Sequence, residues 1–292
     1  MEVEVPYATF LDELLMGTAV PFLGAGASLC GWKRKDRWGP RRAARPPKTK
    51  ELAAHLAKRM AYTTRRPCTC EMEDLARMSS YFAATLGDLD GALTTLMTHT
   101  GKPRRLHLLL AKVRPQLIIV TNYDTLVEDA FEQLAVPYDL LIYSLRRPGR
   151  LLWKKWGCPV ENVAPKKVVE NGRSIVFKLH GGICEHGSTG FLITEDHYVD
   201  LLSCIADATS PVPQCLKERL KASRFLFLGH GLHDWDVRVL LKLVTLPPDD
   251  RKHHWAFQKA PTSWEIRAWG TRGVQLCPID LSTFTKKLEA LL

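Results

Sequence analysis

Residues 21–28 read Pro-Phe-Leu-Gly-Ala-Gly-Ala-Ser, an apolar run that ends in small residues. Three further segments have the same form: Ile-Ile-Val-Thr-Asn-Tyr-Asp at 118–124, Phe-Lys-Leu-His-Gly at 177–181 and Phe-Leu-Phe-Leu-Gly-His-Gly at 225–231. Buried parallel strands read as continuous apolar runs and deliver functional groups at their carboxyl ends. The four segments therefore predict parallel strands whose ends form one crevice, suited to a nucleotide.

Apolar residues recur at helical spacing between these segments, so strands and helices alternate along the chain. The expected fold class is α/β, a Rossmann-like and mostly parallel sheet flanked by helices, with helical insertions. We expect one domain over residues 1–292, with a helical insertion at 48–113 and a smaller one at 185–222. Strands are predicted at 19–23, 116–121, 138–143, 174–178, 225–228, 254–257 and 274–276, a helix at 236–244, and a basic loop from the end of the third strand to residue 172.

The composition is that of a globular protein. The 292 residues are 46% hydrophobic and 25% charged, which are ordinary values. The first residues lack a secretory signal, and no run approaches the ~18 apolar residues of a membrane span, so we expect a cytoplasmic protein without a membrane segment. None of the eight cysteines forms a CxxC pair, which favours reduced thiols over a metal site.

The formal net charge of +10 is concentrated in two basic segments. Residues 33–50 contain nine Lys or Arg opposed by Asp36 alone, and residues 146–155 precede Trp156 and include Trp153. Basic residues beside aromatic rings can bind single-stranded nucleic acid. They can equally hold a pyrophosphate, dock on an acidic partner or form a solvated surface.

The first segment ends in a candidate phosphate loop. Glycines at 24 and 26 would let backbone N–H groups of this turn approach a phosphate closely. The usual dinucleotide fingerprint has a third glycine, where this chain has Leu29. A tight structural turn is the alternative interpretation.

The second segment offers an amide and a carboxylate where a strand meets a helix. Asn122 carries two donors and an acceptor, which suit ribose hydroxyls or a carboxamide. Asp124 could accept from a carboxamide or stabilise a developing positive charge. It also stands where a helix begins, so capping is the competing role.

The last two segments add histidines. His180 could act as a general base at neutral pH, or be a satisfied core histidine. Glycines at 229 and 231 suit close approach to a nucleotide, and Asp234 could cap the next helix. A metal site built from His230, His233 and the neighbouring carboxylates is the weaker interpretation.

In this order the motifs resemble those of the sirtuin-like NAD-hydrolase family, in the bacterial antiphage-defence branch that lacks the zinc module. The family's Gly-Ala-Gly-x-Ser loop matches residues 24–28, and its Thr-Asn-Tyr-Asp motif matches 121–124. Its His-Gly pair matches 180–181, and its Gly-Tyr-Ser-Leu-x-Asp segment is similar to 229–234. A Thr-x-x-x-Tyr helix start occurs at 194–198.

The resemblance implies an enzyme that takes NAD as its substrate and cleaves the nicotinamide–ribose bond. The implied catalytic residues are Asn122, His180 and Asp124. Zinc is not expected, since the two CxxC pairs of the deacylases are missing. Water then becomes the expected acceptor, and the product is ADP-ribose. Cyclic ADP-ribose is the alternative product. The residues implied for NAD binding are Gly24, Ala25, Gly26, Ser28, Thr121, Tyr123, Gly229, His230, Gly231 and Asp234.

Members of this branch are commonly effectors of antiphage defence that stay inactive until infection is signalled. The implied partners are further copies of the chain or a separate sensor, such as an ATPase or an Argonaute-type subunit. The competing hypothesis is a catalytically silent subunit that binds a nucleotide or nucleic acid.

Overall fold

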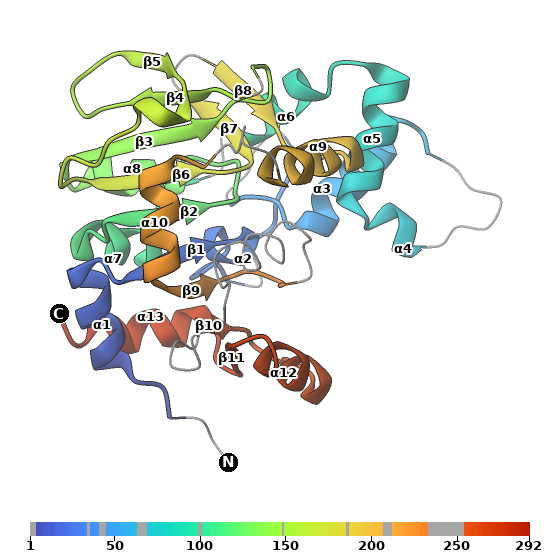
Figure 1. The fold of residues 1–292 in the computed structure, drawn as a ribbon. Coiled ribbons are helices and arrows are strands. Elements are labelled where there is room, and N and C mark those ends of the chain that lie inside the picture. The colour runs from blue at the N-terminus through green and yellow to red at the C-terminus, as the bar shows by residue number, and fades with distance from the viewer. Residues whose placement is uncertain are drawn as a thin grey trace.

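The computed structural model describes residues 4–33, 36–40, 45–62, 69–98, 101–147, 149–184, 187–206, 212–232 and 254–292. Within these ranges it shows a nine-stranded sheet and a separate two-stranded hairpin (Figure 1). The strands are β1 (Ala19–Leu23), β2 (Leu117–Val120), β3 (Tyr138–Tyr143), β4 (Leu151–Lys154), β5 (Val160–Val163), β6 (Ser174–Lys178), β7 (Gly181–Cys184), β8 (Gly187–Phe191), β9 (Arg224–Leu228), β10 (His254–Phe257) and β11 (Val274–Cys277).

The large sheet is mostly parallel and runs in the order β11-β10-β9-β1-β2-β6-β3-β4-β5. Strands β4 and β5 are its antiparallel edge, while β11 to β3 pair in parallel. From β1 the chain goes to β2 on one side, and it later adds β9 on the other side of β1. Such a reversal opens a crevice at the carboxyl ends of the two strands. The Rossmann-like α/β fold predicted from the sequence is confirmed.

Helices cover both faces of the sheet and one end of it. They are α1 (Tyr7–Met16), α2 (Ala25–Ser28), α3 (Thr49–Arg59), α4 (Thr69–Met72), α5 (Leu75–Leu86), α6 (Leu89–Met97), α7 (Arg105–Val113), α8 (Leu126–Gln133), α9 (Glu195–Ala206), α10 (Gln214–Ala222), α12 (Ser263–Gly270) and α13 (Leu281–Glu289), with a 3₁₀ turn at Pro165–Lys167. None of the helices in the described ranges combines the length and the apolar composition that a membrane span requires.

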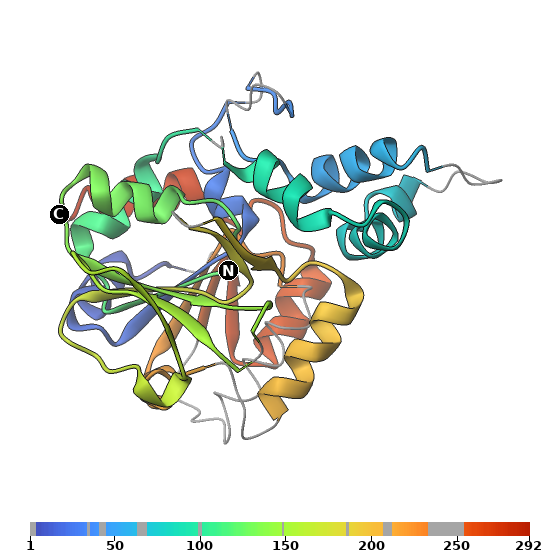
Figure 2. The same ribbon diagram turned by 90° about the horizontal axis from the view of Figure 1, so that it is seen from above.

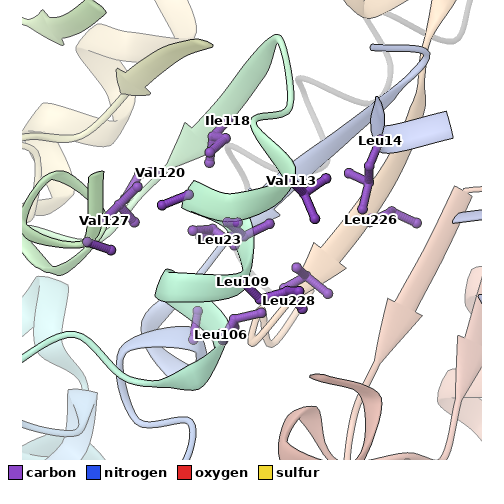
Figure 3. Packing of buried hydrophobic residues seen from close by; sticks show 14 of the residues in the cluster. Leu14, Leu23, Leu106, Leu109, Val113, Ile118, Val120, Val127, Leu226 and Leu228 are labelled. Carbon is purple, nitrogen blue, oxygen red and sulfur yellow. The ribbon is translucent and has the colours of Figure 1, made fainter. Parts of the chain in front are cut away.

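Alternate residues of each strand enter different cores, as the two-residue period of a strand requires. In β2, Ile118 and Val120 belong to the core beneath α1, α7, α8 and α13, whereas Leu117 and Ile119 belong to the core beneath α9, α10 and α12. Figure 3 shows the first core, where Leu109 of α7 and Val127 of α8 pack against the strands. Because both faces are buried, these strands read as continuous apolar runs.

A third core lies outside the sheet. Leu56 of α3, Phe82 of α5 and Leu93 of α6 pack together, and Phe191 of the β7–β8 hairpin joins them. Figure 2 shows α3–α6 as a group that projects from the body formed by the sheet. Helix α7 does not belong to this group, because its Leu106 and Leu110 pack in the first core.

The prediction of a basic loop up to residue 172 was wrong. Strands β4 and β5 and the 3₁₀ turn lie in this segment. Leu151 and Trp153 are buried in the second core, whereas Leu152 and Lys154 are half-buried, so the true signal was a short alternating pattern hidden among Arg, Pro and Gly. The β7–β8 hairpin and α12 were also not anticipated, and the helix predicted at 236–244 lies outside the described residues.

Candidate functional site

The loops that follow β1 and β9 are bonded to each other at the crevice. The Gly24 N–H donates to Leu228 O at 3.0 Å, and the Gly26 N–H donates to Gly229 O at 2.9 Å. A Cβ on Gly26 would lie 2.9 Å from the Gly229 Cα, and a Cβ on Gly229 would lie 2.1 Å from the Ala27 nitrogen. The two backbones can therefore meet only because these positions are glycine. Contact between the two backbones therefore accounts for the glycines at 26 and 229.

A cavity of about 1000 Å³ opens at these strand ends, between the sheet and the projecting helices. The sheet side of its wall contains eleven of the thirteen residues predicted for the site. These are Ala25, Gly26, Ser28, Thr121, Asn122, Tyr123, Asp124, His180, Gly229, His230 and Gly231. Gly24 lies directly behind this wall, and Asp234 lies outside the described residues. The wall that faces the sheet comes from α3, α5, α6 and α9, and includes Leu52, Leu75, Met97 and Tyr198.

Asn122, Ser28 and Asp124 form a buried hydrogen-bond chain. The Asn122 amide donates to Ser28 Oγ at 2.6 Å and to the Gly24 carbonyl at 2.9 Å. The Ser28 hydroxyl in turn donates to Asp124 Oδ2 at 2.6 Å. A hydroxyl carries one hydrogen and two lone pairs, so Ser28 can accept from the amide while it donates to the carboxylate. The chain fixes the orientation of all three side chains.

The next helix, α8, has Thr125 at its N-cap, and Asp124 contributes a side-chain bond from one residue earlier. Its Oδ1 accepts from the Leu126 N–H at 3.2 Å, at the first turn of α8. His107 of α7 was missed by sequence reasoning, although it lies near this carboxylate. Burial lowers the pKa of His107 to about 4, and the charge of Asp124 only partly opposes this effect. Its Nδ1 accepts from the Arg104 N–H at 3.2 Å, so the imidazole beside Asp124 is neutral near pH 7.

His180 lies two residues beyond the end of β6 and is 4% exposed. Its ring meets the Tyr198 ring edge to face, with 5.9 Å between the ring centres. Its carbonyl accepts from the Leu192 N–H at 2.9 Å, which ties this turn to the β7–β8 hairpin. The sheet thus brings an imidazole and the Asn122 amide to the wall of one cavity.

The remaining predicted residues join the neighbouring strand ends. The Thr121 hydroxyl lies 3.1 Å from both the Leu23 carbonyl and His230 Nε2, and so connects β2 to β1 and β9. The Tyr123 hydroxyl donates to the Leu192 carbonyl at 2.7 Å. These bonds make the cavity wall one connected polar layer.

A second residue that sequence reasoning missed is Lys178, the last residue of β6. Its side chain is fully buried, and its ammonium donates to the Asp124 carbonyl at 2.6 Å and to Glu128 Oε1 at 2.9 Å. Burial raises the pKa of Glu128, and the adjacent ammonium opposes that rise. The available signal was a lysine in an otherwise apolar strand.

Several cations of the two basic segments are engaged within the protein. Arg45 is buried and forms a bidentate pair with Glu51, with bonds of 2.6 and 2.7 Å. Arg146 pairs with Asp90 at 3.2 Å, and the Lys155 ammonium lies 4.2 Å from the Trp153 ring centre. Within the described ranges, no three His, Cys, Asp or Glu side chains gather as a metal site would require.

Comparison with known proteins places this geometry in a family. The family model of the SIR2-like domain matches residues 116–277, more than half of the chain, and this range contains β2, β6, β9 and the polar residues at their ends. A comparison with curated proteins finds no match. The chain therefore belongs to the SIR2-like domain family, part of a superfamily of NAD-dependent enzymes.

Proposed function

We propose that this protein hydrolyses the nicotinamide–ribose bond of NAD and releases nicotinamide and ADP-ribose. The observation that carries the proposal is the cavity at the reversal point of the sheet, whose wall includes Asn122, Asp124 and His180. Family membership supports NAD as the substrate, and the three side chains support the chemistry.

The cavity suits a dinucleotide in both size and composition. Its volume of about 1000 Å³ is at the upper end of the range common for small-molecule sites. Polar side chains line the wall formed by the strand ends. On the helical side, Leu52, Leu75 and Met97 contribute apolar surface beside the charged Lys48, Lys50, Asp74 and Glu195. Ribose and amide groups would find partners on the first wall, and an aromatic base would find contact area on the second.

The hydrogen bonds within the site limit what Asn122 can do. Both hydrogens of its amide are already donated, to the Gly24 carbonyl and to Ser28 Oγ. A bond from Asn122 to a ligand would therefore use Oδ1, which only accepts. Ribose hydroxyls and water both donate, so Asn122 would orient the ribose or the attacking water.

The reaction needs no oxidant or further reactant besides water. The C–N bond breaks with its electron pair leaving on the nicotinamide nitrogen, which becomes neutral. Water forms the new C–O bond and loses one proton. His180 would bind the ribose hydroxyls or accept this proton, since a histidine can act as a base at neutral pH. Asp124 would accept from the carboxamide.

The test is to incubate the full chain with NAD and separate the products by chromatography. We expect nicotinamide and ADP-ribose, with both lost in Asn122→Ala and His180→Ala. Asn162→Ala and His55→Ala are matched controls, because neither residue belongs to the cavity wall, and both should keep the activity. A wild-type chain that neither binds NAD in calorimetry nor cleaves it contradicts the proposal.

The silent nucleotide-binding subunit remains a second candidate. The observation that favours it is that Asn122, Ser28 and Asp124 satisfy one another, so they have a structural role independent of chemistry. It predicts NAD binding without turnover, in the isolated chain and in its complexes. Salt-dependent binding of single-stranded nucleic acid without NAD binding would indicate the nucleic-acid alternative.

The family resemblance supports a proposal for the biological role. We infer that the enzyme depletes NAD in antiphage defence and is activated by self-assembly or by a sensor subunit. Cellular NAD should then fall after phage challenge in cells that express the wild-type chain, and should stay constant with Asn122→Ala. If the NAD level stays constant in cells with either chain while the purified enzyme is active, the defence role is contradicted and the proposed reaction is not.

A further inference from the structure

We propose that Lys178 is a positioning residue, whose buried ammonium holds the turn at 121–124 and thereby the orientation of Asn122 and Asp124 toward the cavity. The inference rests on the proposed function for its kinetic consequence. Its structural part, the clamping of the turn, can be tested without NAD.

All three hydrogens of the ammonium have acceptors within the protein. Lys178 Nζ donates to the Asp124 carbonyl at 2.6 Å, to Glu128 Oε1 at 2.9 Å and to the Tyr123 carbonyl at 3.4 Å. An ammonium has three donors, so this is a complete set. Two of the acceptors are consecutive main-chain carbonyls of the turn that carries the candidate catalytic side chains. The cation therefore fixes backbone, which a salt bridge between side chains alone would not do.

The ammonium of Lys178 lies beside an apolar core, where a charged side chain is unusual. Val176, two residues earlier on the same face of β6, packs in the apolar core beneath α7 and α8. A buried ion pair is often no more stable than an apolar pair of similar volume, because both charges lose their hydration. An apolar residue at 178 would serve the core equally well, but it could not bond to the carbonyls of Tyr123 and Asp124.

The start of β7, directly after His180, packs around this ammonium. Gly182 has φ +141°, and a Cβ there would lie 3.0 Å from the Lys178 Cε and 3.1 Å from the Tyr123 carbonyl oxygen. The space is therefore available because position 182 is glycine. Lys178 thus contacts the turn that bears Asn122 and also packs against the start of β7, which follows His180. One side chain couples the two halves of the candidate catalytic site.

A double variant separates this role from a purely structural one. Lys178→Met removes the ammonium and leaves Glu128 without its partner, which lowers stability. Lys178→Met combined with Glu128→Gln removes the buried carboxylate as well, and should recover much of the thermal midpoint. We expect kcat to stay about 10²-fold below wild type in both, since misplacing a catalytic group by about 1 Å has that effect, with a smaller change in KM.

The single variant Glu128→Gln and the exposed Lys221→Met serve as comparisons. Glu128→Gln keeps the ammonium and its two carbonyl bonds, so its loss of kcat should be smaller than that of Lys178→Met. Amide hydrogen exchange at residues 121–126 should quicken in the Lys178 variants and not in Lys221→Met. This measurement needs no substrate, so it tests whether Lys178 holds the turn at 121–124 even if the wild-type chain does not cleave NAD.

The inference is overturned if the double variant recovers wild-type kcat together with its thermal midpoint. It is equally overturned if exchange at 121–126 matches wild type in all the Lys178 variants. Faster exchange in Lys178 variants of a chain whose wild type neither binds nor cleaves NAD would support the clamp, while the missing binding and cleavage would contradict the proposed reaction.

Discussion

Ser28 Oγ lies 2.6 Å from Asp124 Oδ2, although 96 positions separate the two residues in the chain. The bond joins α2, the short helix after β1, to the loop after β2, and it continues to the Asn122 amide. Ser28 was predicted to contact the cofactor directly. Its hydroxyl also bonds to both residues proposed for catalysis, so Ser28 holds the loop at 121–124 in addition to its predicted role.

Removing the Ser28 hydroxyl should weaken both the fold and the activity. Ser28→Ala leaves the Asn122 amide and the Asp124 carboxylate each with one buried bond fewer, and the expected loss in the free energy of unfolding is about 1–3 kcal/mol. Urea titration measures this loss, and kcat for nicotinamide release should fall with it. Ser203→Ala on the exposed side of α9 is the control, and it should leave both quantities unchanged. An equal effect of the two variants would mean that the hydrogen bonds of Ser28 contribute neither to stability nor to activity.

Adding one methyl group at the contact between the β1 and β9 loops should be strongly destabilising. Gly229 has φ +74°, and its Cβ would lie 2.1 Å from the Ala27 nitrogen. Strain and overlap together predict a loss of about 3 kcal/mol for Gly229→Ala. Gly39→Ala is the matched control, because none of the residues that the structure describes has an atom within 4 Å of its Cβ and the backbone is not left-handed, so its change should stay within about 0.5 kcal/mol. Thermal unfolding of the two variants compares them directly, and similar midpoints would show that the loops do not need the contact.

The buried imidazole of His107 should make stability fall in mild acid. Its pKa is about 4 in the folded chain and near 6.5 when exposed, so below pH 6.5 the unfolded state binds the extra proton. Stability from this group is complete above pH 6.5 and decreases by as much as about 3 kcal/mol by pH 4. Asp129 acts in the opposite sense, because burial raises its pKa to about 6 and the folded state then binds more protons below that pH.

The two effects are separated by comparing variants across pH 4–8 in urea titrations. His107→Gln cannot be protonated, and its amide oxygen can still accept from the Arg104 N–H. The difference in stability between wild type and His107→Gln should shrink as the pH falls from 6.5 to 4. The corresponding difference for Asp129→Asn should change in the other direction between pH 6 and 4. A difference for His107→Gln that does not vary with pH would mean that the imidazole is protonated equally in both states.

The sequence predicted those features of the fold that local pattern determines. Strands such as β3 and β6 lie at their predicted bounds, because continuous apolar runs ending in polar residues mark strands buried on both faces. The same rule placed Asn122 and His180 at one edge of the sheet, since parallel strands end together. Long-range contacts had no such signal. Nothing in the sequence around His107 indicates Asp124 as its neighbour, and Lys178 reads as one polar residue within a strand.

The basic segment at 33–50 can be tested for a structural role at Arg45. Its guanidinium donates to both oxygens of Glu51, to the Asp36 carbonyl at 2.8 Å and to the Pro46 carbonyl at 2.8 Å, and its side chain is 7% exposed. Arg45→Met removes these charge-assisted bonds and should lower the free energy of unfolding by about 2 kcal/mol. Lys58→Met, on the exposed side of α3, removes the same charge and should leave stability unchanged. An equal and negligible effect of both variants would mean that the bonds of Arg45 do not stabilise the fold. If Arg45 behaves as expected, this arginine holds the chain that enters α3 and does not belong to the charge that a nucleic acid or an acidic partner would meet.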